Sequence, residues 1–161
     1  MKGLFFEEIA EGQTETLGSY HFTREAIISY ARKYDPQPFH LDEEAGRRSH
    51  FGSLCASGWH TCAAWMKCFV SFNDRHMTMR RARGETAAQL GPSPGFENLR
   101  WLKPVYAGET LHCRRTTLEA RRSASRPDMG LVKFRWELFG AEGEKTTDIV
   151  ATCLLAVRAA K

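Results

Sequence analysis

Residues 58–70 read GWHTCAAWMKCFV, and this stretch decides the fold. Its apolar residues recur at helical spacing, and they occupy nearly every side of the helix that they predict. A helix with so little polar surface belongs inside a protein, so we expect other segments to wrap around it. The stripe expected to face the interior consists of Trp59, Ala63, Met66 and Val70.

Strand-like segments follow this helix. Alternating and β-branched residues predict strands at 96–102, 108–119, 130–139 and 146–157, with turns at 106–109 and 141–144. Another strand is expected within 12–22, before the helix. Strands without helices between them favour an antiparallel sheet, so the pattern indicates an α+β fold with the sheet curled around the helix.

A second helix is predicted after the first strand. Thr23 stands where a helix N-cap is expected, and apolar residues at helical spacing continue to Tyr34. Pro36 disfavours a helical conformation at Asp35, so the helix should end there. Together with Pro38, it bars a helix between Asp35 and His40 and stiffens the connecting loop.

Composition narrows the class of protein. The 161 residues carry 23 Lys and Arg against 19 Asp and Glu, and we expect one domain over residues 1–161. A net charge of +4 is too small to argue for nucleic acid but suits a phosphate-bearing ligand. No apolar run reaches the roughly 20 residues of a membrane span, and the acidic N-terminal segment is unlike a secretory signal.

Five cysteines form no C-x-x-C pair, which argues against a disulfide framework and a zinc ribbon. Free thiols suit a reducing compartment, so we expect a cytoplasmic protein. We expect no metal site.

Asp35 and His40 are candidates for acid–base chemistry. A stiff loop that holds a carboxylate and an imidazole suits general acid and base catalysis, which needs fixed reactive groups. A purely structural alternative is equally open: Asp35 caps a helix, and His40 bonds a backbone carbonyl.

Gly58 is a candidate for stabilising negative charge. It falls in the first turn of the buried helix, where free N–H groups and the helix dipole favour a carbonyl oxygen that gains charge. The structural alternative is that Ser57 is an N-cap and that Gly58 merely allows close packing. His60, nearby, is more typical of a core histidine than of a ligand.

Several motifs in order resemble the MaoC-like dehydratases, a group similar to the (R)-specific enoyl-thioester hydratases. They are DPQPFHLD at 35–42, Phe51-Gly52, ASGWHT at 56–61, RWLKPV at 100–105 and GETL at 108–111. The resemblance runs from about Phe22 to Val157.

This resemblance implies a hot-dog fold, in which an antiparallel sheet wraps a long central helix, and a homodimer or a multiple of dimers with shared sites. The family's catalytic Asp and His match Asp35 and His40, and its carbonyl-polarising glycine matches Gly58. Phe39, Ser57, Trp59 and Met66 are expected to contact the substrate. Ser57 and Met66 replace a family histidine and a family serine, and Gln37 replaces an asparagine.

The activity implied is hydration of 2-enoyl thioesters, or dehydration of 3-hydroxyacyl thioesters, with water activated by the Asp–His pair. Coenzyme A enters as part of the substrate, and no other cofactor is expected. Two alternatives stay open: a thioesterase on the same fold, and a non-catalytic module that binds acyl thioesters. Basic residues that could line the path of coenzyme A are Arg80, Arg81, Arg83, Arg121, Arg122 and Arg126.

Overall fold

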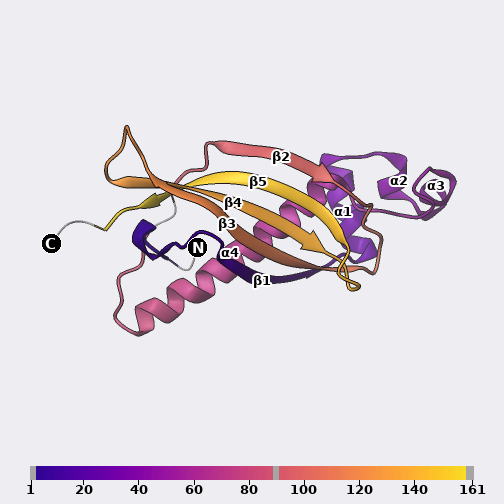
Figure 1. Cartoon of the computed structure of the whole chain (residues 1–161). Helices are drawn as coiled ribbons and strands as arrows, with labels where there is room; N and C mark the ends of the chain where they lie inside the picture. Colours follow the sequence, from indigo (N-terminus) through magenta and orange to yellow (C-terminus); the bar gives the residue numbers. More distant parts are fainter. Residues whose placement is uncertain (1–2, 89–90, 159–161) are drawn as a thin grey trace.

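A five-stranded antiparallel sheet and one long helix dominate the computed structural model, which describes residues 3–88 and 91–158 (Figure 1). The strands lie in the order β1-β3-β4-β5-β2. Their bounds are β1 Thr14–His21, β2 Gly95–Trp101, β3 Thr110–Arg122, β4 Met129–Phe139 and β5 Lys145–Ala156. The helical elements are η1 Phe6–Glu8, α1 Arg24–Tyr34, α2 Pro38–Leu41, α3 Glu43–Arg48 and α4 Gly58–Ala82.

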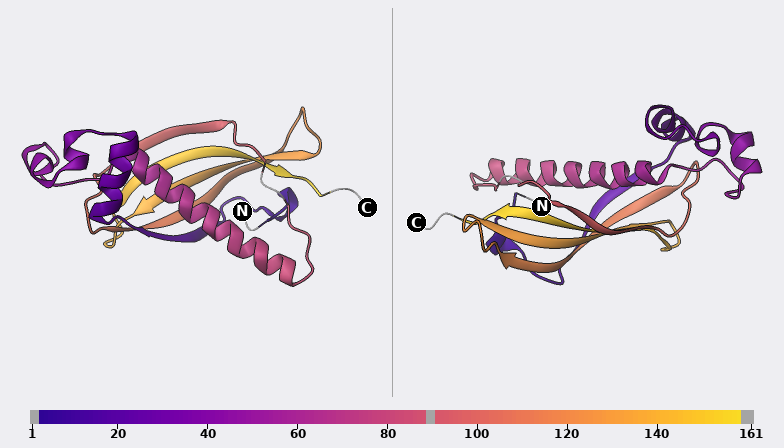
Figure 2. Two further views of the ribbon diagram at one scale, coloured as in Figure 1. Left: turned by 180° about the vertical axis from the view of Figure 1, so that it is seen from behind. Right: turned by 90° about the horizontal axis from the view of Figure 1, so that it is seen from above.

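The helix α4 lies along one face of the sheet, and the short helices α1, α2 and α3 gather at its N-terminal end (Figure 2). This is the arrangement expected of a hot-dog fold, and all five expected strands are present. Although α4 has 25 residues, no helix in residues 3–88 or 91–158 is long and apolar enough to cross a membrane.

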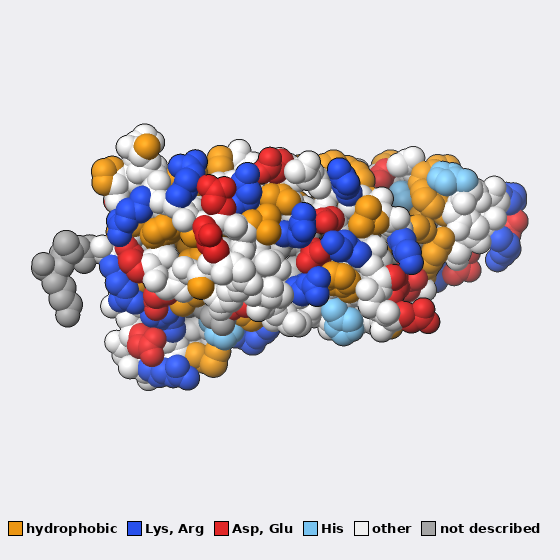
Figure 3. Space-filling model, in the orientation of Figure 1, with side chains coloured by type: hydrophobic (Ala, Val, Ile, Leu, Met, Phe, Trp, Pro, Cys, Tyr) orange, Lys and Arg blue, Asp and Glu red, His pale blue; other side chains and the backbone are white. Residues whose placement is uncertain are grey.

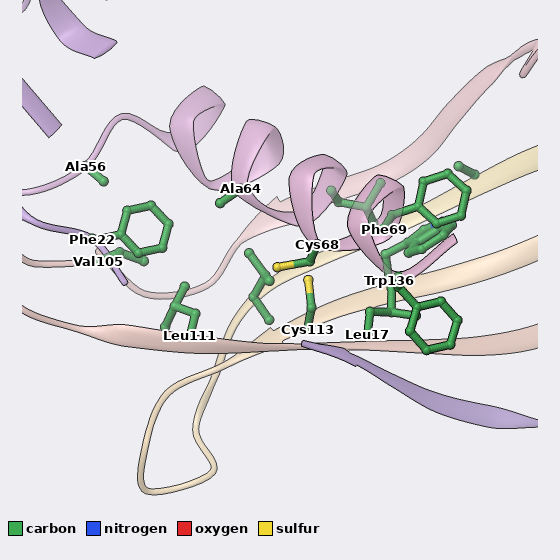
Figure 4. Close-up of a cluster of buried hydrophobic side chains, with 14 of the residues drawn as sticks. Leu17, Phe22, Ala56, Ala64, Cys68, Phe69, Val105, Leu111, Cys113 and Trp136 are labelled. Carbon is green, nitrogen blue, oxygen red and sulfur yellow. The ribbon is translucent and has the colours of Figure 1, made fainter. Parts of the chain in front are cut away.

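Because its side chains alternate, the sheet has one charged face and one largely apolar face, which also holds the buried ion pair of Arg115 and Glu15. On β4, Val132, Phe134 and Trp136 are buried, and Figure 4 shows Trp136 beneath α4. The opposite face carries interleaved basic and acidic side chains (Figure 3). Ion pairs join the strands on this face: Arg114–Glu137 links β3 to β4, Arg135–Asp148 links β4 to β5, and Lys133–Glu97 reaches across β5 from β4 to β2. The single apolar face therefore has one helix to cover it.

The prediction of which stripe of α4 faces the sheet was wrong. Trp59, Met66 and Val70 are 50, 44 and 44 % exposed in the chain, and Ala63 is exposed as well. The residues that face the interior are His60, Thr61, Ala64, Cys68, Phe69, Phe72 and Asn73. Because α4 is apolar on several sides, periodicity could not select the face that packs on the sheet.

The helix α1 begins and ends where the sequence predicts. The Thr23 side chain accepts a hydrogen bond from the Ala26 N–H, and α1 ends at Tyr34, as expected. The expectation that no helix lies between Asp35 and His40 was wrong, since Pro38 opens the short helix α2. Proline is tolerated at the first helical position because its missing N–H has no partner there. His40 thus lies on a helical turn, with Asp35 just before it.

Candidate functional site

A cavity of about 490 Å³ opens where α2, the start of α4 and the segment after β2 meet. It contains both members of the expected pair, Asp35 and His40, and also Gly58. The residues that line it are Asp35, Gln37, Phe39, His40, Phe51, Cys55, Ala56, Gly58, Trp59, Thr61, Trp101, Leu102, Lys103, Pro104 and Val105.

His40 is held in one orientation by the backbone. Its side chain is buried, and its Nδ1 lies 2.7 Å from the carbonyl oxygen of Cys55. A carbonyl only accepts hydrogen bonds, so Nδ1 carries the proton that is donated. In the neutral ring the other nitrogen, Nε2, is then the basic atom, and it lies 3.5 Å from Asp35 Oδ2. The structural alternative for His40 is therefore also realised, and it fixes the tautomer that a base requires.

Both carboxylate oxygens of Asp35 accept hydrogen bonds. The Ser57 hydroxyl donates to Oδ2 at 2.6 Å, and the Gln37 amide donates to Oδ1 at 2.9 Å. Burial alone would raise the pKa of Asp35, but these two hydrogen bonds and the neighbouring His40 bring the pKa below its usual value. Asp35 is thus an ionised, oriented carboxylate at neutral pH.

Ser57 has two roles in the structure. Besides its bond to Asp35, its Oγ accepts a hydrogen bond from the Trp59 N–H and so caps α4. The capping alternative drawn from the sequence is therefore correct, and the bond to Asp35 is an addition that spacing alone does not show. Ser57 is buried and is not among the residues that line the cavity.

Gly58 begins α4, so its N–H belongs to the first turn, where helical N–H groups have no partner inside the helix. The indole of Trp101 covers this residue, and Trp101 Nε1 donates to the Gly58 carbonyl at 2.9 Å. A Cβ added at Gly58 would lie 2.5 Å from the indole ring. The absence of a side chain at Gly58 therefore permits the indole to pack directly on the start of α4.

Of the other residues expected to contact the substrate, some line the cavity and one does not. Phe39 and Trp59 line the cavity, as expected. Met66 does not: it lies two turns further along α4, is 44 % exposed, and is absent from the lining. The sequence reasoning missed Phe51 and Trp101 as lining residues, although the Pro104-Val105 pair after β2 marked the segment that closes the cavity.

Cys55 lines the cavity beside His40, with its Sγ 3.6 Å from Nδ1. Burial raises the pKa of the Cys55 thiol to about 11. The thiol is therefore neutral, and it is a poor nucleophile at this position.

The arginines expected to line a path for coenzyme A lie at the other end of the elongated chain, near the end of α4 and the β3–β4 hairpin (Figure 1). Five of them form ion pairs with acidic residues: Arg80 with Glu8 and Glu85, Arg83 with Glu85, Arg121 with Glu119, Arg122 with Glu7 and Arg126 with Asp128. None of these arginines, nor Arg81, lines the cavity. Among the residues that line it, Lys103 is the one lysine or arginine.

A metal would need a cluster of ligating side chains. In the described parts of the chain, no group of three or more His, Cys, Asp or Glu side chains is placed to hold a metal ion.

Comparisons with known proteins agree on one family. Residues 6–130 match the family model described as the MaoC like domain. A crystal structure of a MaoC-like dehydratase from Rhodospirillum rubrum is 34 % identical, with 98 % of this chain and 99 % of that chain covered and a TM-score of 0.82. R-hydratase PhaJ1 from Pseudomonas aeruginosa has a TM-score of 0.66 at 20 % identity over 98 % of this chain and 92 % of that chain, and so shares the fold.

A curated relative, protein MaoC of Klebsiella aerogenes, is 27 % identical over 82 % of this chain. The match spans 37 % of that protein's length. On the family match over most of its length and the similarity to the Rhodospirillum protein, this chain belongs to the MaoC-like domain family.

Proposed function

We propose that this protein adds water to 2-enoyl thioesters of coenzyme A, or removes it from 3-hydroxyacyl thioesters. The observation that carries the proposal is the pairing of Asp35 Oδ2 with His40 Nε2 at 3.5 Å, inside a cavity that Gly58 also lines. A dehydratase and an R-hydratase among the similar structures support this reaction class.

The Asp–His pair can activate one water. Both Oδ2 and Nε2 are acceptors when Asp35 is ionised and His40 is neutral, so a water between them donates one proton to each. His40 takes up the proton that the water loses as its oxygen bonds to the β-carbon. The same proton then passes from Nε2 to the α-carbon, which leaves His40 neutral again.

Negative charge develops on the thioester oxygen while the α-carbon awaits its proton. The Gly58 N–H at the start of α4 is available to stabilise that charge, and the dipole of the helix acts in the same direction. Removal of one such donor typically costs about 3 kcal/mol of transition-state stabilisation. Every proton in these steps moves between water, substrate and this chain, so no further cofactor is a reactant, and the five free thiols suit a cytoplasmic setting.

We propose further that the active form is a homodimer joined along β2. This strand is at the edge of the sheet and has unpaired backbone groups, which a second copy would satisfy. Apolar side chains are exposed on α4 (Trp59, Met66 and Val70) and on or just after β2 (Phe96, Trp101 and Leu102), and the Trp59 and Trp101 rings are in contact. Because Trp59, Trp101 and Leu102 also line the cavity, a partner there would complete the site.

The decisive experiment follows a panel of enoyl thioesters by loss of the conjugated absorbance, together with release of free thiol. Asp35→Asn and His40→Gln each remove a proton acceptor and are expected to lower turnover by about 10²–10⁴-fold. Asp42→Asn is the matched control, because Asp42 caps α3 in the same segment and lies outside the cavity.

Three results would contradict the proposal. Thiol release without loss of the double bond would indicate a thioesterase, and tight binding without turnover would indicate a binding module. Wild-type rates in Asp35→Asn would exclude a role for the Asp35 carboxylate in activating the water.

A further inference from the structure

A pair of buried thiols lies away from the candidate active site. Cys68 is on the inner face of α4 and Cys113 is on β3, and they are 6 and 1 % exposed. Figure 4 shows the two sulfur atoms turned toward each other between helix and sheet. Both are free thiols, and each shifts the pKa of the other.

A second cavity gives access to Cys68, the member of this pair on α4. It measures about 210 Å³ and is lined by Cys68 together with Leu17, Gly18, Ser19, Tyr20, Lys67, Ser71 and Arg75. The register of β1 against β3 slips between Thr16 and Gly18, and Gly18 is the residue paired with Cys113. At this bulge Gly18 has φ +134°, and a Cβ there would meet nothing within 4 Å. The bulge and the missing side chain therefore leave an opening at the β1 edge of the sheet.

The charges around Cys68 favour its thiolate. The hydrogen bond from Cys113 lowers the pKa of Cys68 and outweighs its burial, and the positive charges of Lys67 and Arg75 act in the same direction. Arg75 is held in place by a hydrogen bond to the Leu17 carbonyl at 3.3 Å, and Lys67 lies over the Tyr20 ring. Burial and the neighbouring Cys68 raise the pKa of Cys113. Cys68 is thus suited to be the nucleophile, and Cys113 remains protonated beside it.

We propose that Cys68 and Cys113 form an oxidation site for small hydroperoxides, at which the two thiols are converted reversibly to a disulfide between α4 and β3. The Cys68 thiolate attacks the peroxide oxygen and becomes a sulfenic acid, and the peroxide is reduced to water or an alcohol. The Cys113 sulfur then attacks the Cys68 sulfur, and the sulfenic hydroxyl leaves as water with the Cys113 proton. The two electrons lost by the thiols are those that reduce the peroxide.

This site is separate from the proposed hydratase chemistry. Cys68 lies ten residues after Gly58, which is about 15 Å along the helix axis. Its cavity opens at the β1 edge, and β2 lies at the other edge of the sheet. Oxidation can therefore be measured whether or not the protein turns over a thioester.

The test treats the reduced protein with one equivalent of hydrogen peroxide and maps its peptides without reduction. The expected product is a Cys68–Cys113 disulfide, seen as the loss of two hydrogen atoms from the intact mass and reversed by dithiothreitol. In Cys113→Ser the disulfide cannot form, so the sulfenic acid on Cys68 should accumulate and react with dimedone. Lys67→Gln should slow the first step, since it removes a positive charge that favours the thiolate.

Cys153→Ser is the matched control, since Cys153 is a partly buried thiol on β5 that the mechanism does not use. It should form the Cys68–Cys113 disulfide at the wild-type rate. Peptide maps of the wild-type protein do not depend on the folding of any variant. They show directly whether the Cys68–Cys113 disulfide forms. The proposal is overturned when peroxide leaves Cys68 reduced, or when oxidation is spread over the other cysteines.

Discussion

Ser57 donates a 2.6 Å hydrogen bond to Asp35 Oδ2, the same oxygen that faces His40 Nε2. The residue that caps the long helix therefore also holds the carboxylate of the catalytic pair proposed here. The start of α4, its cap and the carboxylate form one hydrogen-bonded unit, which relates the position of Gly58 to that of Asp35.

Removal of this hydroxyl should alter the ionisation of Asp35. In Ser57→Ala we expect the pKa of Asp35 to rise, because burial raises it and the hydrogen bond that opposes this effect is gone. Because Asp35 must be ionised to act, the activity of Ser57→Ala should begin to fall at a higher pH than that of the wild type as the pH is lowered. Titration of the Asp35 carboxyl carbon by NMR measures the shift directly, and kcat should fall more than KM changes.

The loss of the helix cap is controlled separately. Ser57→Ala also removes a cap worth about 1 kcal/mol of stability. Thr23→Ala removes the equivalent cap of α1 and should cost similar stability without moving the pKa of Asp35. Ser57→Thr keeps a hydroxyl and should restore the wild-type pKa. An unchanged Asp35 titration in Ser57→Ala would show that the bond does not control ionisation.

A methyl group at Gly58 should collide with Trp101. In a helix alanine is more favourable than glycine by up to about 1 kcal/mol, so any destabilisation by Gly58→Ala must be steric. We expect this variant to lose stability because its Cβ would lie 2.5 Å from the indole. In a Trp101→Leu background the penalty should shrink, with a coupling of about 0.5–3 kcal/mol in urea unfolding. Additive effects of the two changes would contradict the contact.

Buried His60 should make stability depend on pH. Burial lowers its pKa to about 4 from the usual 6.5. The unfolded chain then binds a proton between these values that the folded chain does not, so stability is full above about pH 6.5 and falls as the pH drops toward 4. The loss amounts to at most about 3 kcal/mol.

The replacement His60→Asn removes the titrating ring and should flatten this part of the stability curve, even though it lowers stability by disturbing the stack with Tyr30. Exposed His112 provides the control, since His112→Asn should leave the slope in place. Denaturant midpoints measured between pH 4 and 7 test both. A slope that persists in His60→Asn would assign the effect to another group.

A charge at Met66 should affect assembly more than folding. Met66 is 44 % exposed and lies two helical turns after Trp59 on the exposed apolar stripe of α4, so Met66→Asp should weaken the proposed dimer. Met79 is equally exposed, at 43 %, but lies on another side of the helix, and Met79→Asp should leave the dimer intact. Sedimentation at micromolar concentration distinguishes the two, and a wild-type monomer would contradict the dimer itself.

Much of this protein is determined by local sequence signals. Thr23 caps α1, Pro36 ends it, and alternation along 130–139 produces a strand with one buried face, because each depends on backbone geometry or on neighbours a few residues away. The motif residues Asp35, His40 and Gly58 could likewise be selected from the sequence, and they line one cavity.

Only the tertiary structure decided which face of α4 is buried. Apolar residues surround the start of this helix, and the face that packs is the one whose side chains fit those of the sheet, as the contact of Phe69 with Trp136 on β4 shows. Contacts between distant segments, such as Ser57 with Asp35, Trp101 with Gly58 and Cys68 with Cys113, follow from that packing. No periodicity encodes them, because their partners are brought together by the shape of the folded chain rather than by spacing along it.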